Sequence, residues 1–148
     1  VTRLEQFFPE LSRALRSASE TRRTTARVTA CEMALAHTGI VDELVVRFLD
    51  RLRQGDRFSA AERAEIDAVV ARLDEEYFRL SKAVEYDHAR ASEVIQAFAK
   101  ARAVAAIAVA GLGTVEANED AIYEATHAME RSGSEMIMRI RKCLESGE

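Results

Sequence analysis

The sequence has few residues that interrupt helices and none of the short patterns that begin a β-hairpin. Its 148 residues contain one proline and six glycines, and neither Asn-Gly nor Asp-Gly occurs in it. No run alternates β-branched and polar residues, so no strand is predicted. Ala, Arg and Glu, which are all good helix formers, are its commonest residues. We therefore expect an all-α protein.

Cysteine is also scarce, and no uncharged run is long. Cys31 and Cys143 have no partner at the spacing of a metal or redox motif, so neither a disulfide scaffold nor a paired-cysteine site is indicated. The longest uncharged stretch, 103–115, is too short to cross a bilayer. The N-terminus lacks the pattern of a signal peptide. We expect a cytoplasmic protein that does not enter a membrane.

Length and composition fit one domain that spans residues 1–148. Apolar residues make up 48% of the chain and charged residues 31%, which argues against both a disordered and a membrane protein. The formal net charge of −4 argues against nucleic acid as the main partner. Five arginines lie between residues 13 and 27. They form either an arm for an acidic partner or a solvated face that complements the acidic remainder.

Capping residues and apolar positions at helical spacing divide the chain into four to six helices. Ser59-Ala-Ala-Glu62 is the clearest start, and the apolar stripe after it continues to residue 110 as one helix or as two. Further breaks are predicted near Gly39 and Gly111. The alanine-rich, nearly uncharged stretch before Gly111 is predicted to be the central helix. Short loops favour packing as an antiparallel bundle.

The first segment, 1–18, is rich in phenylalanine. It opens with a capping box at Thr2 and Glu5, and Pro9 either kinks the helix or begins a second one. Its apolar face needs a cover, so we expect it to pack on a neighbouring subunit, as in a homodimer, or on a protein partner. The predicted interface residues are Leu4, Phe7, Phe8 and Leu11.

The feature nearest to a chemical motif is a pair of Glu-x-x-His sequences, Glu85 to His88 and Glu124 to His127. Residues three apart lie on the same side of a helix. In ferritin-like four-helix proteins, two such motifs and two further Glu residues hold a pair of metal ions. Imidazole and carboxylate ligands suit iron or manganese. Glu32, beside the inner stripe of its helix, is the candidate for an additional ligand. An apolar segment separates the two motifs, which departs from the pattern of that class.

No glycine-rich phosphate loop and no recognisable catalytic motif occur in the sequence, so an enzyme is not indicated. We predict a helical-bundle interaction protein that acts by self-association or by binding a protein partner. One alternative is a carboxylate–histidine metal protein. The other is a sensor that holds a small molecule in an apolar pocket between its helices.

Overall fold

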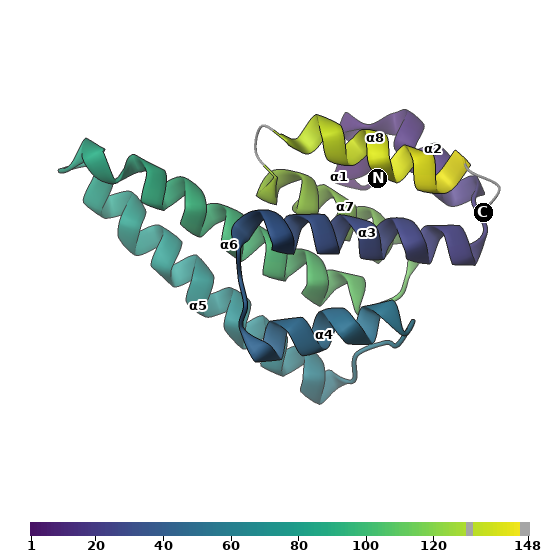
Figure 1. The fold of residues 1–148 in the computed structure, drawn as a ribbon, viewed down its shortest axis with the longest axis horizontal. Helices are drawn as coiled ribbons and strands as arrows, with labels where there is room; N and C mark the ends of the chain where they lie inside the picture. The colour runs from purple at the N-terminus through teal and green to yellow at the C-terminus, as the bar shows by residue number, and fades with distance from the viewer. Residues whose placement is uncertain (130–131, 146–148) are drawn as a thin grey trace.

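The computed structural model describes residues 1–129 and 132–145, and all the regular secondary structure in these ranges is helical (Figure 1). The all-α prediction is therefore confirmed. The predicted number of four to six helices is wrong, because the described ranges contain eight α-helices and one 3-10 turn. In chain order these are α1 (Arg3–Phe7), α2 (Pro9–Ser17), α3 (Glu20–Thr38), α4 (Glu43–Arg53), α5 (Ala60–Val84), η1 (His88–Arg90), α6 (Ala91–Ala110), α7 (Val115–Ala128) and α8 (Gly133–Glu145).

The additional helices come from breaks at which the sequence left alternatives open or gave a weak signal. Pro9 is the first residue of α2, where its missing N–H costs nothing, so the first segment is two short helices. The stretch 59–110 also forms two helices. They separate where the Asp87 side chain accepts a hydrogen bond from the Ala89 N–H and begins η1.

The C-terminal part forms two helices. The first, α7, starts at Val115, where the Thr114 side chain accepts a hydrogen bond from the Ala117 N–H, and it ends at Ala128. Gly133 begins the second, α8.

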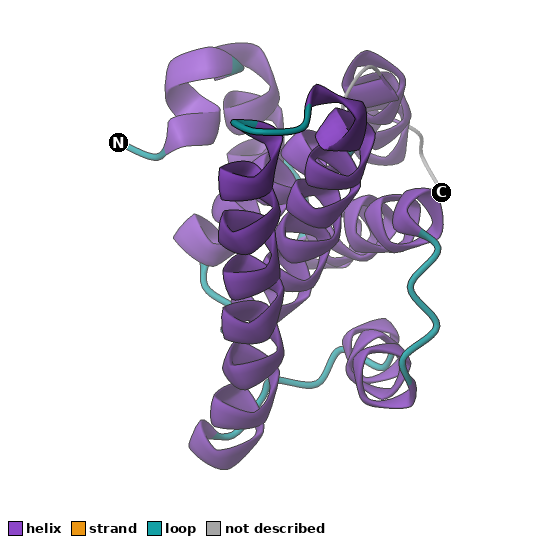
Figure 2. Cartoon of the chain, turned by 90° about the vertical axis from the view of Figure 1, so that its left-hand side faces the viewer, coloured by secondary structure: helices purple, strands orange, loops and turns teal. Residues whose placement is uncertain are grey.

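The central helix is α6, as its alanine content predicted. Half of its 20 residues are buried, and every buried one is Ala, Val or Ile. Such small side chains allow close approach of neighbouring helices, and α6 packs against α3, α4, α5 and α7. Figure 2 shows the all-helical packing of the molecule from another side. No helix in the described part of the chain has both the length and the apolar composition needed to cross a bilayer.

A long helical hairpin made by α5 and α6 extends from the body of the molecule. Its tip, residues 85–90, lies beyond every other described element at the far left of Figure 1. Apart from α6 and η1, the main neighbour of α5 is α4. Among the described elements, the far half of the hairpin therefore has no cover other than its own two helices and η1.

Candidate functional site

The structure places the two Glu-x-x-His motifs in different parts of the molecule. Glu85 caps the end of α5 and His88 begins η1, so both lie exposed at the hairpin tip. Glu124 and His127 lie on α7, which passes behind α3 in the view of Figure 1. The two pairs do not meet.

Glu124 and His127 already have structural partners. Arg102 of α6 donates from Nη1 to a Glu124 carboxylate oxygen at 3.0 Å and from Nη2 to Asp74 of α5 at 2.8 Å. This arginine therefore links α5, α6 and α7. The His127 ring stands edge-on to Tyr123, with 4.5 Å between ring centroids.

The remaining metal candidate, Glu32, pairs with Arg53 of α4, with 3.2 Å between Arg53 Nη2 and a carboxylate oxygen. Within residues 1–129 and 132–145, no three His, Cys, Asp or Glu side chains lie close enough together to hold one ion. The described geometry thus offers no ligand set for iron or manganese, and that idea stays a prediction from sequence.

The four residues predicted to contact another subunit separate into two kinds. Leu4 and Leu11 are buried in this chain's own core, because α1 and α2 pack on α7 and α8. The cover that we expected from a partner subunit therefore comes, for these two leucines, from helices of the same chain. Phe8 is half-buried, whereas Phe7 is mostly exposed and stacks on Tyr123 at 6.0 Å between centroids.

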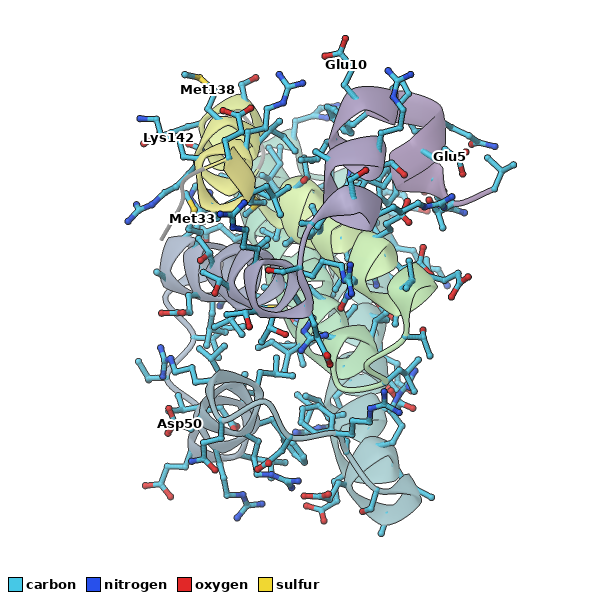
Figure 3. All side chains as sticks on the ribbon, turned by 90° about the vertical axis from the view of Figure 1, so that its right-hand side faces the viewer. Glu5, Glu10, Met33, Asp50, Met138 and Lys142 are labelled. Carbon is cyan, nitrogen blue, oxygen red and sulfur yellow. The ribbon has the colours of Figure 1, made fainter. Side chains whose placement is uncertain are left out.

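An ion pair also ties the first segment to the last helix. Arg141 Nη2 of α8 lies 2.7 Å from a carboxylate oxygen of Glu10 on α2. In Figure 3, α2 and α8 stand side by side, and the labelled Glu10 and Met138 point away from the core. The N- and C-terminal segments therefore close over α3 and α7 together.

A buried carboxylate that the sequence did not reveal joins the first segment to α7. Glu119 is 0% exposed and accepts hydrogen bonds from Ser12 Oγ at 2.6 Å, Thr2 Oγ1 at 2.7 Å and Arg16 Nε at 2.8 Å. Burial alone would raise the pKa of Glu119, but these three donors outweigh burial and hold it below its ordinary value. The sequence could have indicated the burial of Glu119 in one way: Glu119 lies three residues before Ile122, which is buried on the same face of α7.

The far half of the hairpin, residues 74–98, carries the largest uncovered set of apolar side chains on any element. Only Leu80 and Ala97 are buried in this range, although Tyr77 packs on Phe98 at 5.3 Å between centroids. Three large side chains are exposed, and we call them the hairpin surface: Phe78 (62% exposed), Tyr86 (90%) and Ile95 (52%).

Charges of both signs lie on the same part of the hairpin. Arg79 pairs with Glu76 on α5, and Arg90 pairs with Glu93 at the start of α6. Further exposed charges in residues 74–98 are Glu75, Lys82, Glu85 and Asp87. The uncovered part of the hairpin therefore combines large apolar side chains with charges of both signs, a composition found at protein–protein interfaces.

Comparison with known proteins found no matching family model, no similar curated protein and no similar solved structure. The function is therefore inferred from the chain's own surfaces and cavities.

Proposed function

We propose that the protein acts by self-association, and that the hairpin surface binds the same surface of a second copy. The observation that carries this proposal is the exposure of Phe78, Tyr86 and Ile95 on two helices that nothing else in the described chain covers. Aromatic side chains left in water on a projecting element mark an interaction site, because their burial is worth about 1.5–3 kcal/mol each.

A second copy suits the shape of the hairpin. Two antiparallel helices bury one face each against the other and leave their remaining sides open to solvent. Two such hairpins packed together form a four-helix bundle, in which every helix has neighbours on two sides. The uncovered half of the hairpin is long enough for this, since α5 has 25 residues and α6 has 20.

The charge pattern also suits a second copy. A two-fold interface brings identical surfaces together, so its charges must complement themselves. Exposed Glu75 and Glu85 on the hairpin can face Lys82 of a second copy. Residues 74–98 contain six Asp or Glu and three Lys or Arg, so such pairs offset part of the repulsion between two acidic surfaces.

Sedimentation of the wild-type chain and of the double variant Phe78→Glu, Ile95→Glu tests the proposal. We expect the wild type to form a dimer whose fraction rises with protein concentration. The dissociation constant of the dimer should rise at least about tenfold in the double variant, because each copy then places two charges in an apolar contact. Both positions are exposed, so the helical circular dichroism should not change.

Met138→Glu is the matched control, since Met138 is an equally exposed apolar residue on α8, away from the hairpin. It should leave the dimer intact. A wild-type chain that stays monomeric at sub-millimolar concentration contradicts the proposal. If Met138→Glu disrupts the dimer and the hairpin double variant does not, the interface lies at α8 and the proposal for the hairpin surface is wrong.

A second candidate function rests on a different observation, a mainly apolar pocket of about 410 Å³ beside the α3–α4 loop. Apolar side chains line it from the loop and α4 and from α5 and α6, and charged side chains also reach it: Ile40, Val45, Val69, Leu73 and Val104, with Asp42, Arg72 and Lys100. Cavities of about 300–1,000 Å³ with apolar walls hold small molecules in many proteins. This supports the small-molecule sensor as the alternative.

Mass spectrometry of the solvent extract from purified protein tests this alternative. We expect one apolar small molecule in a near-stoichiometric amount, and its loss from the variant Val69→Trp, whose indole fills the cavity. The thermal unfolding of the variant shows whether it still folds. An extract without such a molecule, together with no binding of an apolar fluorescent dye by the wild type, would argue against a sensor.

A further inference from the structure

Three arginines line a small polar cavity where α3, the α4–α5 loop and the α6–α7 turn meet. The cavity measures about 110 Å³, and its walls include Arg23 and Arg27 of α3, Arg57 of the loop, and Asn118 of α7. These segments come together at the right-hand end of Figure 1, which faces the viewer in Figure 3. The cavity is unrelated to the hairpin surface.

Arg27 is the unusual member of this set, because it is only 6% exposed and lacks an ionic partner. Its Nη1 donates a hydrogen bond to Asn118 Oδ1, and its Nε has no hydrogen-bond partner among the described residues. No carboxylate in the described ranges lies within ion-pair distance of it. Burial lowers the pKa of Arg27, and the charge of Arg57 lowers it further. A buried cation that meets only an amide is costly, and an anion in the cavity would offset that cost.

Arg57 is held at the cavity by a glycine. Its Nη2 donates to the Gly113 carbonyl at 3.4 Å, so the side chain crosses the α6–α7 turn. Gly113 has a φ of +72°, and a Cβ at this position would lie 2.6 Å from Arg57 Nε. The turn therefore needs glycine for its backbone conformation and for the room that Arg57 occupies.

The acidic side chains at the cavity do not neutralise these arginines. Asp56 pairs with Arg51, at 3.1 Å between Nε and a carboxylate oxygen. Glu20 is exposed and forms no ion pair within the described part of the chain. Arg23 donates to the Ala18 carbonyl, which is a neutral group. The cavity therefore keeps an excess of positive charge.

We propose that this cavity binds a phosphate-type oxyanion, either inorganic phosphate or the phosphoryl group of a small phosphomonoester. The planar guanidinium group presents N–H donors that match the oxygens of a phosphate, and three of them favour a dianion over a carboxylate. The first turn of α7 adds the positive end of its helix dipole, since Val115 also lines the cavity. A volume of about 110 Å³ admits such a group but is far below that of a pocket for a drug-sized molecule.

Calorimetric and NMR titration of the full chain with inorganic phosphate, at an ionic strength held constant with chloride, tests the proposal. We expect saturable binding, a higher melting temperature in phosphate than in chloride, and weak binding of acetate. Arg57→Ala should weaken phosphate binding about tenfold or more, because it removes a charged donor from an exposed position. A parallel titration with phenyl phosphate distinguishes the two ligands. Tighter binding of phenyl phosphate than of inorganic phosphate indicates a phosphomonoester, and loss of binding indicates the free ion.

Arg13→Ala is the matched control. Arg13 is an exposed arginine of α2 that does not line the cavity, and its removal changes the net charge by the same amount. It should leave phosphate affinity unchanged.

Arg27→Met separates a binding role from a structural one. Loss of phosphate binding with an unchanged or higher melting temperature in chloride supports the proposal, because methionine removes an unpaired buried charge at similar length. Two results would overturn it: phosphate that binds no more tightly than chloride, or equal loss of affinity in Arg57→Ala and Arg13→Ala.

Discussion

Replacement of Glu119 by alanine should lower the free energy of unfolding by about 3 kcal/mol, because three hydrogen-bond donors lose their acceptor at once. Ser12 is itself buried, so its hydroxyl would be left without a partner in the core. The side chain of Arg16 is 44% exposed, so water screens its share, and most of the loss comes from the two hydroxyls and the cavity. Urea unfolding followed by circular dichroism measures the change.

Glu119→Gln is the matched variant, since it keeps the shape and the oxygen that accepts from Ser12 and Thr2 but removes the charge that faces Arg16. It should cost less than alanine, about 1–2 kcal/mol. Equal losses in the two variants would mean that the charge, and not the set of hydroxyl hydrogen bonds, stabilises this junction. A loss under 1 kcal/mol in Glu119→Ala would contradict the role assigned to the carboxylate.

The difference in unfolding free energy between the wild type and Glu119→Gln should depend on pH, and the pKa of Glu119 gives the direction. The pKa of Glu119 in the folded chain is below its ordinary value of 4.5, so its ionised form is stabilised by folding. This contribution is fully present above about pH 4.5 and is lost as the pH falls through the lowered pKa. The wild type should therefore lose its advantage over Glu119→Gln in acid. The neighbouring Asp120 has a pKa raised by burial and by the charge of Glu119, so it acts in the opposite direction, and Glu119→Gln removes the second of these causes.

Local signals in the sequence predicted several helix starts and breaks, although not their full number, because a cap depends on a few neighbouring residues. The Thr2 side chain accepts from the Glu5 N–H, and Ser59 and Glu62 form the full reciprocal capping box. Gly39 ends α3 with a φ of +72°. The alanine-rich stretch 103–110 likewise lies in the central helix, since it contains only Ala, Val and Ile and has no polar side chain to turn toward water.

Residues that act together across the chain could not be predicted in this way. Thr2 and Glu119 meet over a separation of 117 residues, and Arg27 reaches Asn118 over 91. Such pairs depend on how the helices pack, which no short window of sequence contains. The Glu-x-x-His spacing shows the converse limit. Glu85 and His88 lie on either side of a helix break and share no helix face, and the spacing of Glu124 and His127 on α7 says nothing about whether the two pairs meet.

Gly111 offers a test of that packing, because it lies where α6 ends against an aromatic ring. Its φ of −66° is ordinary for any residue, so alanine costs nothing in backbone conformation. A Cβ there would, however, lie 2.0 Å from Phe58 Cδ2 and 2.5 Å from Phe58 Cγ, close to the root of the ring. Phe58 packs edge-to-face on the buried Phe48 at 4.8 Å between centroids, which limits how it can move.

Gly111→Ala should therefore destabilise the fold by about 2–3 kcal/mol, the range of overpacking in a core. Gly39→Ala is the control for backbone strain alone, since its φ is positive and no atom lies within 4 Å of the added Cβ. It should cost about 1 kcal/mol. Equal losses in both variants would show that the ring gives way easily and that α6 can shift against the α4–α5 loop.

A double-mutant cycle with Phe58→Ala identifies the clash directly. Once the ring is gone, Gly111→Ala should cost nothing, and it should even stabilise the fold by about 0.5–1 kcal/mol, because alanine favours the right-handed helical backbone of this position more than glycine does. The coupling energy between the two positions should thus be about 3 kcal/mol, far above the 0.5 kcal/mol expected for independent sites. If the losses of unfolding free energy in Gly111→Ala and Phe58→Ala simply add, then Gly111→Ala destabilises the fold for a reason other than a clash with Phe58. The Phe58 ring would then not pack on the end of α6.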